Sequence, residues 1–195
     1  MKSRRRRSWL SSSSMMNNRG LYIHVPFCVR KCPYCDFYST AGADKLRQEY
    51  ARAVVRNLRN YPEQFGTVYF GGGTPNLIAE HMADILSAVN TAPGAEISAE
   101  CNPASADIGT LRMMRSAGIN RISVGVQSLQ DGELKKLGRL HDSAQAEELI
   151  LAAEEAGFAS VSADVMLGIP GQTAESLTDT IERLAGLPVQ HISAY

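Results

Sequence analysis

Three cysteines, Cys28, Cys32 and Cys35, stand within eight residues of this chain. One loop can wrap thiols at this spacing around a small object, and thiolate is the soft ligand that selects iron–sulfur clusters, zinc or copper(I). A structural zinc site is normally closed by four protein ligands. A cubane [4Fe–4S] cluster held by three cysteines instead leaves one iron without a protein ligand. The spacing therefore favours a cluster with one open iron.

Two other uses of these thiols have to be weighed. A disulfide is disfavoured because no secretory signal pattern places the chain in an oxidising compartment. Zinc remains open as an alternative of another class, a structural zinc-binding module in which His24 or Cys101 would complete the ligand set. Such a module does not explain the glycine and polar residues further along the chain.

Composition limits the kinds of partner. Lys and Arg number 20, Asp and Glu also number 20, and the formal net charge is zero, which gives no electrostatic reason to expect nucleic acid or an anionic membrane as a partner. No apolar run approaches the length of a membrane span. Four cysteines, three of them clustered, are typical of a metal site in a reducing cytoplasm.

The first 19 residues differ from the rest, because four consecutive arginines precede a serine tract without apolar periodicity. Such a segment buries too little surface to offset its ordering entropy. We expect residues 1–19 to be a disordered basic tail, with Met15 or Met16 as a candidate start. Residues 20–195 are expected to form one domain, truncated after its sixth strand.

Short apolar strands alternate with amphipathic helices from Leu21 onward. The predicted strands cover residues 21–25, 67–70, 96–99, 121–124, 160–163 and 191–194. The predicted helices cover residues 44–60, 82–89, 108–114, 143–156 and 177–184. This alternation predicts an α/β fold with a parallel sheet. Since a full barrel needs about 250 residues, we expect a (βα)6 partial TIM barrel, with a doubly wound sheet as the alternative.

Polar or glycine residues follow five of these strands: Cys28, Gly71 to Thr74, Glu100, Gln127 and Asp164. Ligands of parallel α/β proteins bind at the edge where the strands end. We therefore expect these residues to share one site.

Each of these residues could bind a ligand or have a purely structural role. Gly71-Gly-Gly-Thr-Pro75 lets backbone approach a ligand but also suits a tight turn, and it lacks the lysine of a P-loop. Glu100 could face a cationic ligand or cap a helix. Gln127 and Asp164 could hydrogen-bond ribose hydroxyls. Arg139 could pair with a carboxylate or lie exposed in a loop.

Taken in order, these motifs resemble a known family. Cys-x-x-x-Cys-x-x-Cys, Gly-Gly-Gly-Thr-Pro, Glu-Cys-Asn-Pro, Gly-Val-Gln-Ser and Gly-Ile-Pro-Gly-Gln-Thr make residues 21–195 similar to the HemN/HemW group of radical S-adenosylmethionine (SAM) proteins. The resemblance implies that Cys28, Cys32 and Cys35 hold a [4Fe–4S] cluster whose open iron binds SAM. It also implies the residues that line SAM: Tyr22, Tyr34, Gly72, Gly73, Thr74, Glu100, Gln127, Arg139 and Asp164.

The resemblance is closer to the HemW branch. Oxygen-independent coproporphyrinogen III oxidases carry a further cysteine two residues after the third cluster cysteine, where this chain has Phe37. The HemW branch implies a heme chaperone, with heme or porphyrin as cargo and a membrane respiratory enzyme as a heme acceptor. It also implies an electron donor such as flavodoxin or ferredoxin. Coproporphyrinogen III oxidation remains the alternative, so catalysis is left open.

Two departures from the family pattern stand out. The heme-ligating histidine motif of HemW is expected beyond Tyr195, and none of the histidines present matches it: His24, His81, His141 and His191. Cys101 replaces a residue that is more usually alanine in that branch. We expect it to be a small buried residue, with a role as a fourth cluster ligand as the alternative.

Overall fold

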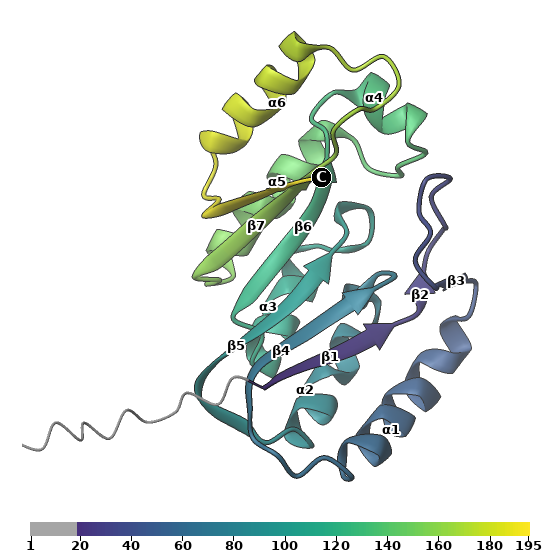
Figure 1. The fold of residues 1–195 in the computed structure, drawn as a ribbon, viewed down its shortest axis with the longest axis vertical. Coiled ribbons are helices and arrows are strands. Elements are labelled where there is room, and N and C mark those ends of the chain that lie inside the picture. Colours follow the sequence, from purple (N-terminus) through teal and green to yellow (C-terminus); the bar gives the residue numbers. More distant parts are fainter. Residues whose placement is uncertain (1–18) are drawn as a thin grey trace, which may run out of the picture.

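A computed structural model describes residues 19–195, and its centre is a six-stranded sheet in the order β1-β4-β5-β6-β7-β8 (Figure 1). All five neighbouring pairs are parallel. The six strands are β1 (Gly20–Val25), β4 (Phe65–Gly72), β5 (Thr91–Cys101), β6 (Arg121–Gln127), β7 (Ser160–Val165) and β8 (His191–Ala194). Spatial order follows chain order, whereas a doubly wound sheet reverses at a switch point. The partial barrel is therefore confirmed and the doubly wound alternative is wrong.

Helices pack on one side of this sheet, behind it in the view of Figure 1. The α-helices are α1 (Arg47–Leu58), α2 (Ala79–Ser87), α3 (Ile108–Ala117), α4 (Asp131–Lys136), α5 (Ser143–Glu155) and α6 (Ala174–Ala185). Three 3₁₀ helices precede some of them: η1 (Asp44–Leu46), η2 (Pro75–Ile78) and η3 (Pro103–Ser105). Gly118 ends α3 at φ +110°, a left-handed conformation that glycine adopts readily. The short helix α4 was not predicted, because six residues are too few to show a period.

The two faces of the sheet differ in chemistry because successive side chains of a strand alternate between faces. Apolar side chains such as Val68, Phe70 and Ile122 pack under the helices. The other face carries polar side chains in register, including the row Glu100, Ser123 and Ser162. The functional side chains therefore have to come from this second, concave face or from the loops at the strand ends.

Cys101 belongs to the apolar face. Its side chain is 3% exposed, and this burial raises the pKa of the thiol to about 12. The expectation of a small buried residue is confirmed, and the residue also borders the cavity at the strand ends.

The three clustered cysteines lie on a loop that leaves β1 at the strand-end side of the sheet (Figure 1). This loop is closed by two short parallel strands, β2 (Phe27–Cys28) and β3 (Thr40–Ala41). The predicted disordered tail lies outside the described residues, apart from Arg19. Among residues 19–195, no helix is long and apolar enough to cross a membrane.

Candidate functional site

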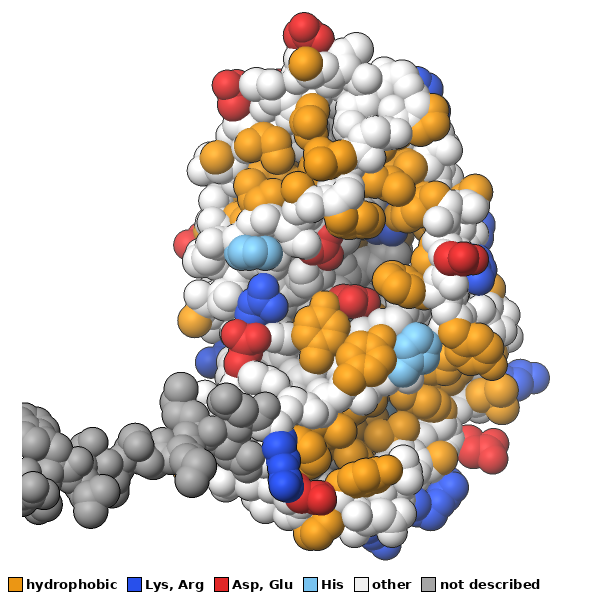
Figure 2. Space-filling model, viewed as in Figure 1, with side chains coloured by type: hydrophobic (Ala, Val, Ile, Leu, Met, Phe, Trp, Pro, Cys, Tyr) orange, Lys and Arg blue, Asp and Glu red, His pale blue; other side chains and the backbone are white. Residues whose placement is uncertain are grey.

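A cavity of about 480 Å³ opens at the ends of the strands, on the concave face. Figure 2 shows this face hollowed at its centre, with acidic side chains in the hollow and hydrophobic side chains on both flanks. The volume is in the range of small-molecule sites. Most of the predicted site residues line it: Tyr34, Cys35, Gly72, Gly73, Thr74, Glu100, Gln127, Arg139 and Asp164.

The cysteine loop forms one wall of the cavity. Its three thiols are free and partly exposed, and the backbone N–H of Cys35 donates to the carbonyl oxygen of Cys32 at 3.1 Å. Within residues 19–195, no three Cys, His, Asp or Glu side chains are placed to hold one metal ion. The cysteines of a cubane each bind a different iron, so they surround a space instead of meeting at a point. Three partly exposed thiols on one loop are a donor set that fits a cluster.

The glycine loop after β4 packs directly against the cysteine loop. A Cβ atom added at Gly73 would lie 2.5 Å from the carbonyl oxygen of Phe27 and 3.0 Å from Cys28 Sγ. Gly72 has φ +114°, and a Cβ there would lie 2.7 Å from a ring carbon of His24. The hydroxyl of Thr74 donates to Cys28 Sγ at 3.6 Å. Glycine is therefore required at both positions, because the start of the cysteine loop leaves no room for a side chain at Gly73 and the His24 ring leaves none at Gly72.

Glu100 and Asp164 place two carboxylates in the cavity, and both accept hydrogen bonds from neutral donors. Glu100 accepts from the Tyr69 hydroxyl at 3.0 Å and from the Gly72 N–H at 3.1 Å. Asp164 accepts from the Ser123 hydroxyl at 2.9 Å. Burial raises the pKa of both carboxyl groups above the usual range. A positively charged ligand between them would favour their ionised forms.

Gln127 ends β6 in an unusual backbone conformation. Its φ is +68°, and within residues 19–195 no other residue except glycine has a positive φ. Such a conformation is strained and persists where the surroundings fix it, often at a functional site. The side-chain carbonyl of Gln127 accepts from the Tyr195 hydroxyl at 2.7 Å. The side chain is thereby held in the wall of the cavity.

Arg139 reaches the cavity from the segment between α4 and α5. One terminal nitrogen donates to the Gly125 carbonyl at 2.7 Å and to Asn102 Oδ1 at 3.2 Å. The other donates to the Tyr34 hydroxyl at 3.5 Å. Its Nε atom is buried without a hydrogen-bond partner. A buried donor without a partner is costly, and an anionic ligand group would satisfy it.

Tyr22 is the predicted SAM residue that does not line the cavity. It lies 56% exposed on β1 and stacks on Tyr69, with ring centroids 6.1 Å apart. Its hydroxyl is 3.0 Å from His24 Nδ1. Tyr22 therefore borders the site at the open side of the barrel, and β4 lies between it and the strand that carries Glu100.

Several cavity residues were missed by the sequence analysis, among them Tyr69, Asn102, Ser123 and Tyr195. A signal for two of them was present. Tyr69 and Ser123 stand on the same face of their strands as other polar residues, so the alternation of two along each strand could have placed them in the concavity. The loop contact of Asn102 and the pairing of Tyr195 with Gln127 depend on tertiary structure.

The fold and the site together define the class of protein. The family model described as the Radical SAM superfamily matches residues 22–184, and the chain belongs to that superfamily. Heme chaperone HemW of Haemophilus influenzae is 36% identical over 190 residues, which are 90% of this chain and 50% of the relative. HemW of Bacillus subtilis is 34% identical over 188 residues, 91% of this chain and 50% of the relative.

A solved structure agrees with these relatives. The structure of the coproporphyrinogen III oxidase HemN from Escherichia coli, a radical SAM enzyme, superposes with a TM-score of 0.79 at 26% identity. The superposition covers 92% of this chain and 44% of the HemN chain. This chain therefore spans about half the length of the relatives that it matches.

Proposed function

We propose that Cys28, Cys32 and Cys35 hold a [4Fe–4S] cluster and that the adjoining cavity binds SAM. The observation that carries the proposal is the direct packing of the glycine loop on the cysteine loop, at one edge of a cavity walled by two partly buried carboxylates and a partly buried guanidinium. A small zwitterionic, nucleoside-bearing ligand matches that set of groups. The zinc-module alternative leaves the cavity without a role.

The residues of the chain would divide the binding of SAM among them. Arg139 is suited to the carboxylate of the ligand, because its Nε lacks a partner. Glu100 is suited to a cationic group, and Gln127 and Asp164 to ribose hydroxyls. When a reduced cluster is bound, it supplies the electron that cleaves SAM reductively. Burial of these side chains would limit the access of water to the reacting groups.

For the complete protein we propose a heme chaperone of the HemW type. Two points support this over coproporphyrinogen III oxidation. The relatives from Haemophilus influenzae and Bacillus subtilis are named heme chaperone HemW, and by the family resemblance Phe37 stands where the oxidases carry a further cysteine. Phe37 is 62% exposed at the cavity and offers no thiol. The cargo would be heme or a porphyrin.

The setting of this function is part of the same proposal. A cytoplasmic location, an electron donor such as flavodoxin or ferredoxin and a membrane-bound heme acceptor would suit it. The proposal also divides the chain into a tail over residues 1–19 and one radical SAM domain over residues 20–195.

Two assays on one preparation distinguish chaperone from oxidase. The reconstituted, reduced protein is titrated with heme and followed by the Soret band, and heme transfer to a heme-free globin is then measured. The same preparation is incubated with coproporphyrinogen III and SAM. We expect heme binding and transfer without conversion of coproporphyrinogen. Conversion to protoporphyrinogen would favour the oxidase, and absence of heme binding by the complete protein would contradict the chaperone.

A further inference from the structure

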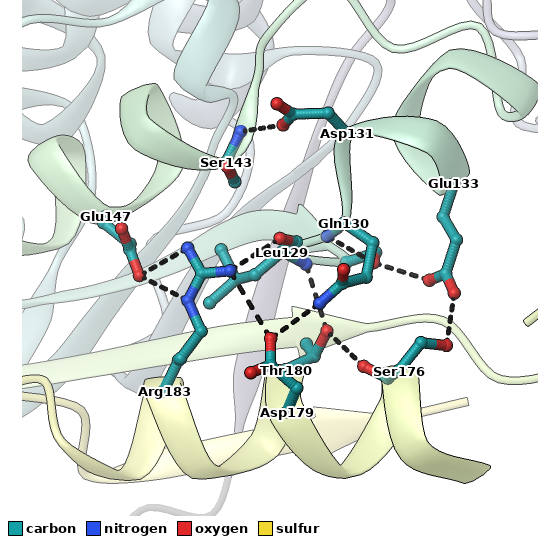
Figure 3. Close-up of polar contacts among 11 residues, drawn as sticks. Leu129, Gln130, Asp131, Glu133, Ser143, Glu147, Ser176, Asp179, Thr180 and Arg183 are labelled. Carbon is teal, nitrogen blue, oxygen red and sulfur yellow. Dashed lines mark hydrogen bonds and ion pairs between the residues drawn. The ribbon is translucent and has the colours of Figure 1, made fainter. Parts of the chain in front are cut away.

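The loop that follows Gln127 is held by helix α6 at consecutive positions (Figure 3). The Leu129 N–H donates to Thr180 Oγ1 at 3.2 Å, and the Leu129 carbonyl accepts from Arg183 Nη1 at 2.8 Å. The side chain of Gln130 donates to Asp179 at 2.6 Å. Because both backbone groups of Leu129 are occupied, the loop cannot shift without breaking contacts to α6.

Glu133 lies beside this loop, on α4, and is 5% exposed. One of its oxygens accepts a hydrogen bond from the Ser128 hydroxyl at 2.6 Å. The other accepts from the Ser176 hydroxyl at 2.6 Å (Figure 3). Gln172 Nε2 lies 3.4 Å from one of these oxygens. Burial of a carboxylate among neutral donors is costly. The same carboxylate is thus bonded to the loop after β6, to the segment before α6 and to α6 itself.

Two of these contacts connect Glu133 to Gln127, a residue of the candidate SAM site. Ser128 directly follows Gln127, whose strained backbone needs support from its surroundings. Gln172 also donates to the Met166 carbonyl at 3.1 Å, and the Met166 N–H donates to the Gln127 carbonyl at 2.9 Å. Two routes therefore lead from Glu133 to Gln127, one through Ser128 in the loop after β6 and one through Gln172 and Met166 after β7.

A third route leads to Arg139. Helix α4 carries Glu133 and ends at the turn that presents Arg139, whose N–H donates to the Leu134 carbonyl at 2.9 Å. Gly138 within this turn has φ +68°, and its carbonyl accepts from Arg30 of the cysteine loop at 2.5 Å. The position of α4 therefore sets where the guanidinium enters the cavity.

We propose that Glu133 is a positioning residue for SAM binding: its buried carboxylate fixes α4 and the β6–α4 loop against α6, and so holds Gln127 and Arg139 in place. The inference rests on the proposed SAM site. A leucine would fill the space without burying a charge, but it would give no directional bonds to Ser128 and Ser176. Groups that hold ligand-binding side chains in this way affect binding without touching the ligand.

The test measures SAM affinity by EPR titration of the reduced, cluster-loaded chain. Glu133→Ala removes the carboxylate and is expected to weaken SAM binding about tenfold. Glu133→Gln is expected to stay close to wild type, because the Ser176 hydroxyl can donate to the Thr173 carbonyl, 3.1 Å away, and accept from the new amide. Ser176→Ala removes the bond to Glu133 together with the bond that Ser176 Oγ accepts from the Thr173 N–H, keeps the carboxylate and is expected to weaken binding roughly threefold. It serves as the test variant if Glu133→Ala does not fold.

Met82→Ala is the control for general destabilisation, since Met82 is fully buried in α2, away from the site. It should lower the melting temperature and leave SAM affinity unchanged. Wild-type affinity in Glu133→Ala, or an equal loss in Met82→Ala, would overturn the inference while the SAM site stands. A wild-type cluster signal that ignores SAM would instead overturn the proposed SAM site, and this inference with it.

Discussion

The hydroxyl of Thr74 lies 3.6 Å from the sulfur of Cys28, although 46 residues separate them. The contact joins the glycine loop after β4 to the first of the clustered cysteines. Each loop is therefore part of the environment of the other, and a change in one should be felt in the other.

Gly73→Ala tests this packing. The new Cβ would lie 2.5 Å from the Phe27 carbonyl oxygen and 3.0 Å from Cys28 Sγ, so backbone has to move. Overpacking of this kind costs about 1–3 kcal/mol, and we expect the variant to lose most of its iron after reconstitution, measured as iron and sulfide per chain. Gly132→Ala is the matched control, because nothing lies within 4 Å of its added Cβ. Full iron content in Gly73→Ala would contradict the packing argument.

Replacement of single cysteines should distinguish the cluster ligands from the cysteine that only packs in the core. Alanine at Cys28, Cys32 or Cys35 is expected to abolish the iron–sulfur absorbance, because the other described thiol, Cys101, is buried. Cys101→Ala should keep the cluster and lose about 1 kcal/mol of stability from the core. Iron analysis and thermal melts of the four variants give the comparison. If the single substitution Cys101→Ala abolished the cluster, Cys101 would be a ligand after all.

Arg139→Lys is expected to weaken SAM binding about tenfold, roughly 1.4 kcal/mol, with the cluster retained. The arginine spans Gly125, Asn102 and Tyr34 and keeps a further donor buried. Lysine has no planar fork and cannot make these bonds together. SAM affinity measured by equilibrium dialysis checks the prediction, and an unchanged affinity would assign Arg139 to structure alone.

Asp164→Asn should make the protein more stable and its SAM site weaker. Burial raises the pKa of Asp164 above its ordinary value of 3.8, so the folded state holds the proton more tightly than the unfolded state. Stability contributed by this group is therefore lost as the pH rises through the interval between the two pKa values. The uncharged asparagine escapes that loss and can still accept from Ser123.

Thermal melts from pH 3 to pH 8 would show the difference between Asp164→Asn and wild type. It should favour the variant at neutral pH and vanish towards the lower end of the range, below the ordinary pKa of 3.8. A variant that is less stable than wild type at pH 7 would show that the charge is compensated within the protein. Weaker SAM binding in the more stable variant would be the cost of a site built for function.

Sequence periodicity predicted the sheet and most of the helices because burial alternates regularly along these elements. The rim residues Glu100, Gln127 and Asp164 followed from one rule, that parallel strands end at one edge. The helix bearing Glu133 escaped prediction because a short, highly charged segment is typical of a surface. The left-handed backbone of Gln127 escaped as well, since it depends on contacts to Met166 and Tyr195 that only the folded chain provides.

The central claim is that three cysteines hold a cluster with one iron open to SAM. The most direct measurement is the EPR spectrum of the anaerobically reconstituted, reduced chain, recorded with and without SAM. We predict a [4Fe–4S] signal that changes when SAM is added. A cluster signal indifferent to SAM, or tightly bound zinc in place of a cluster, would contradict the claim.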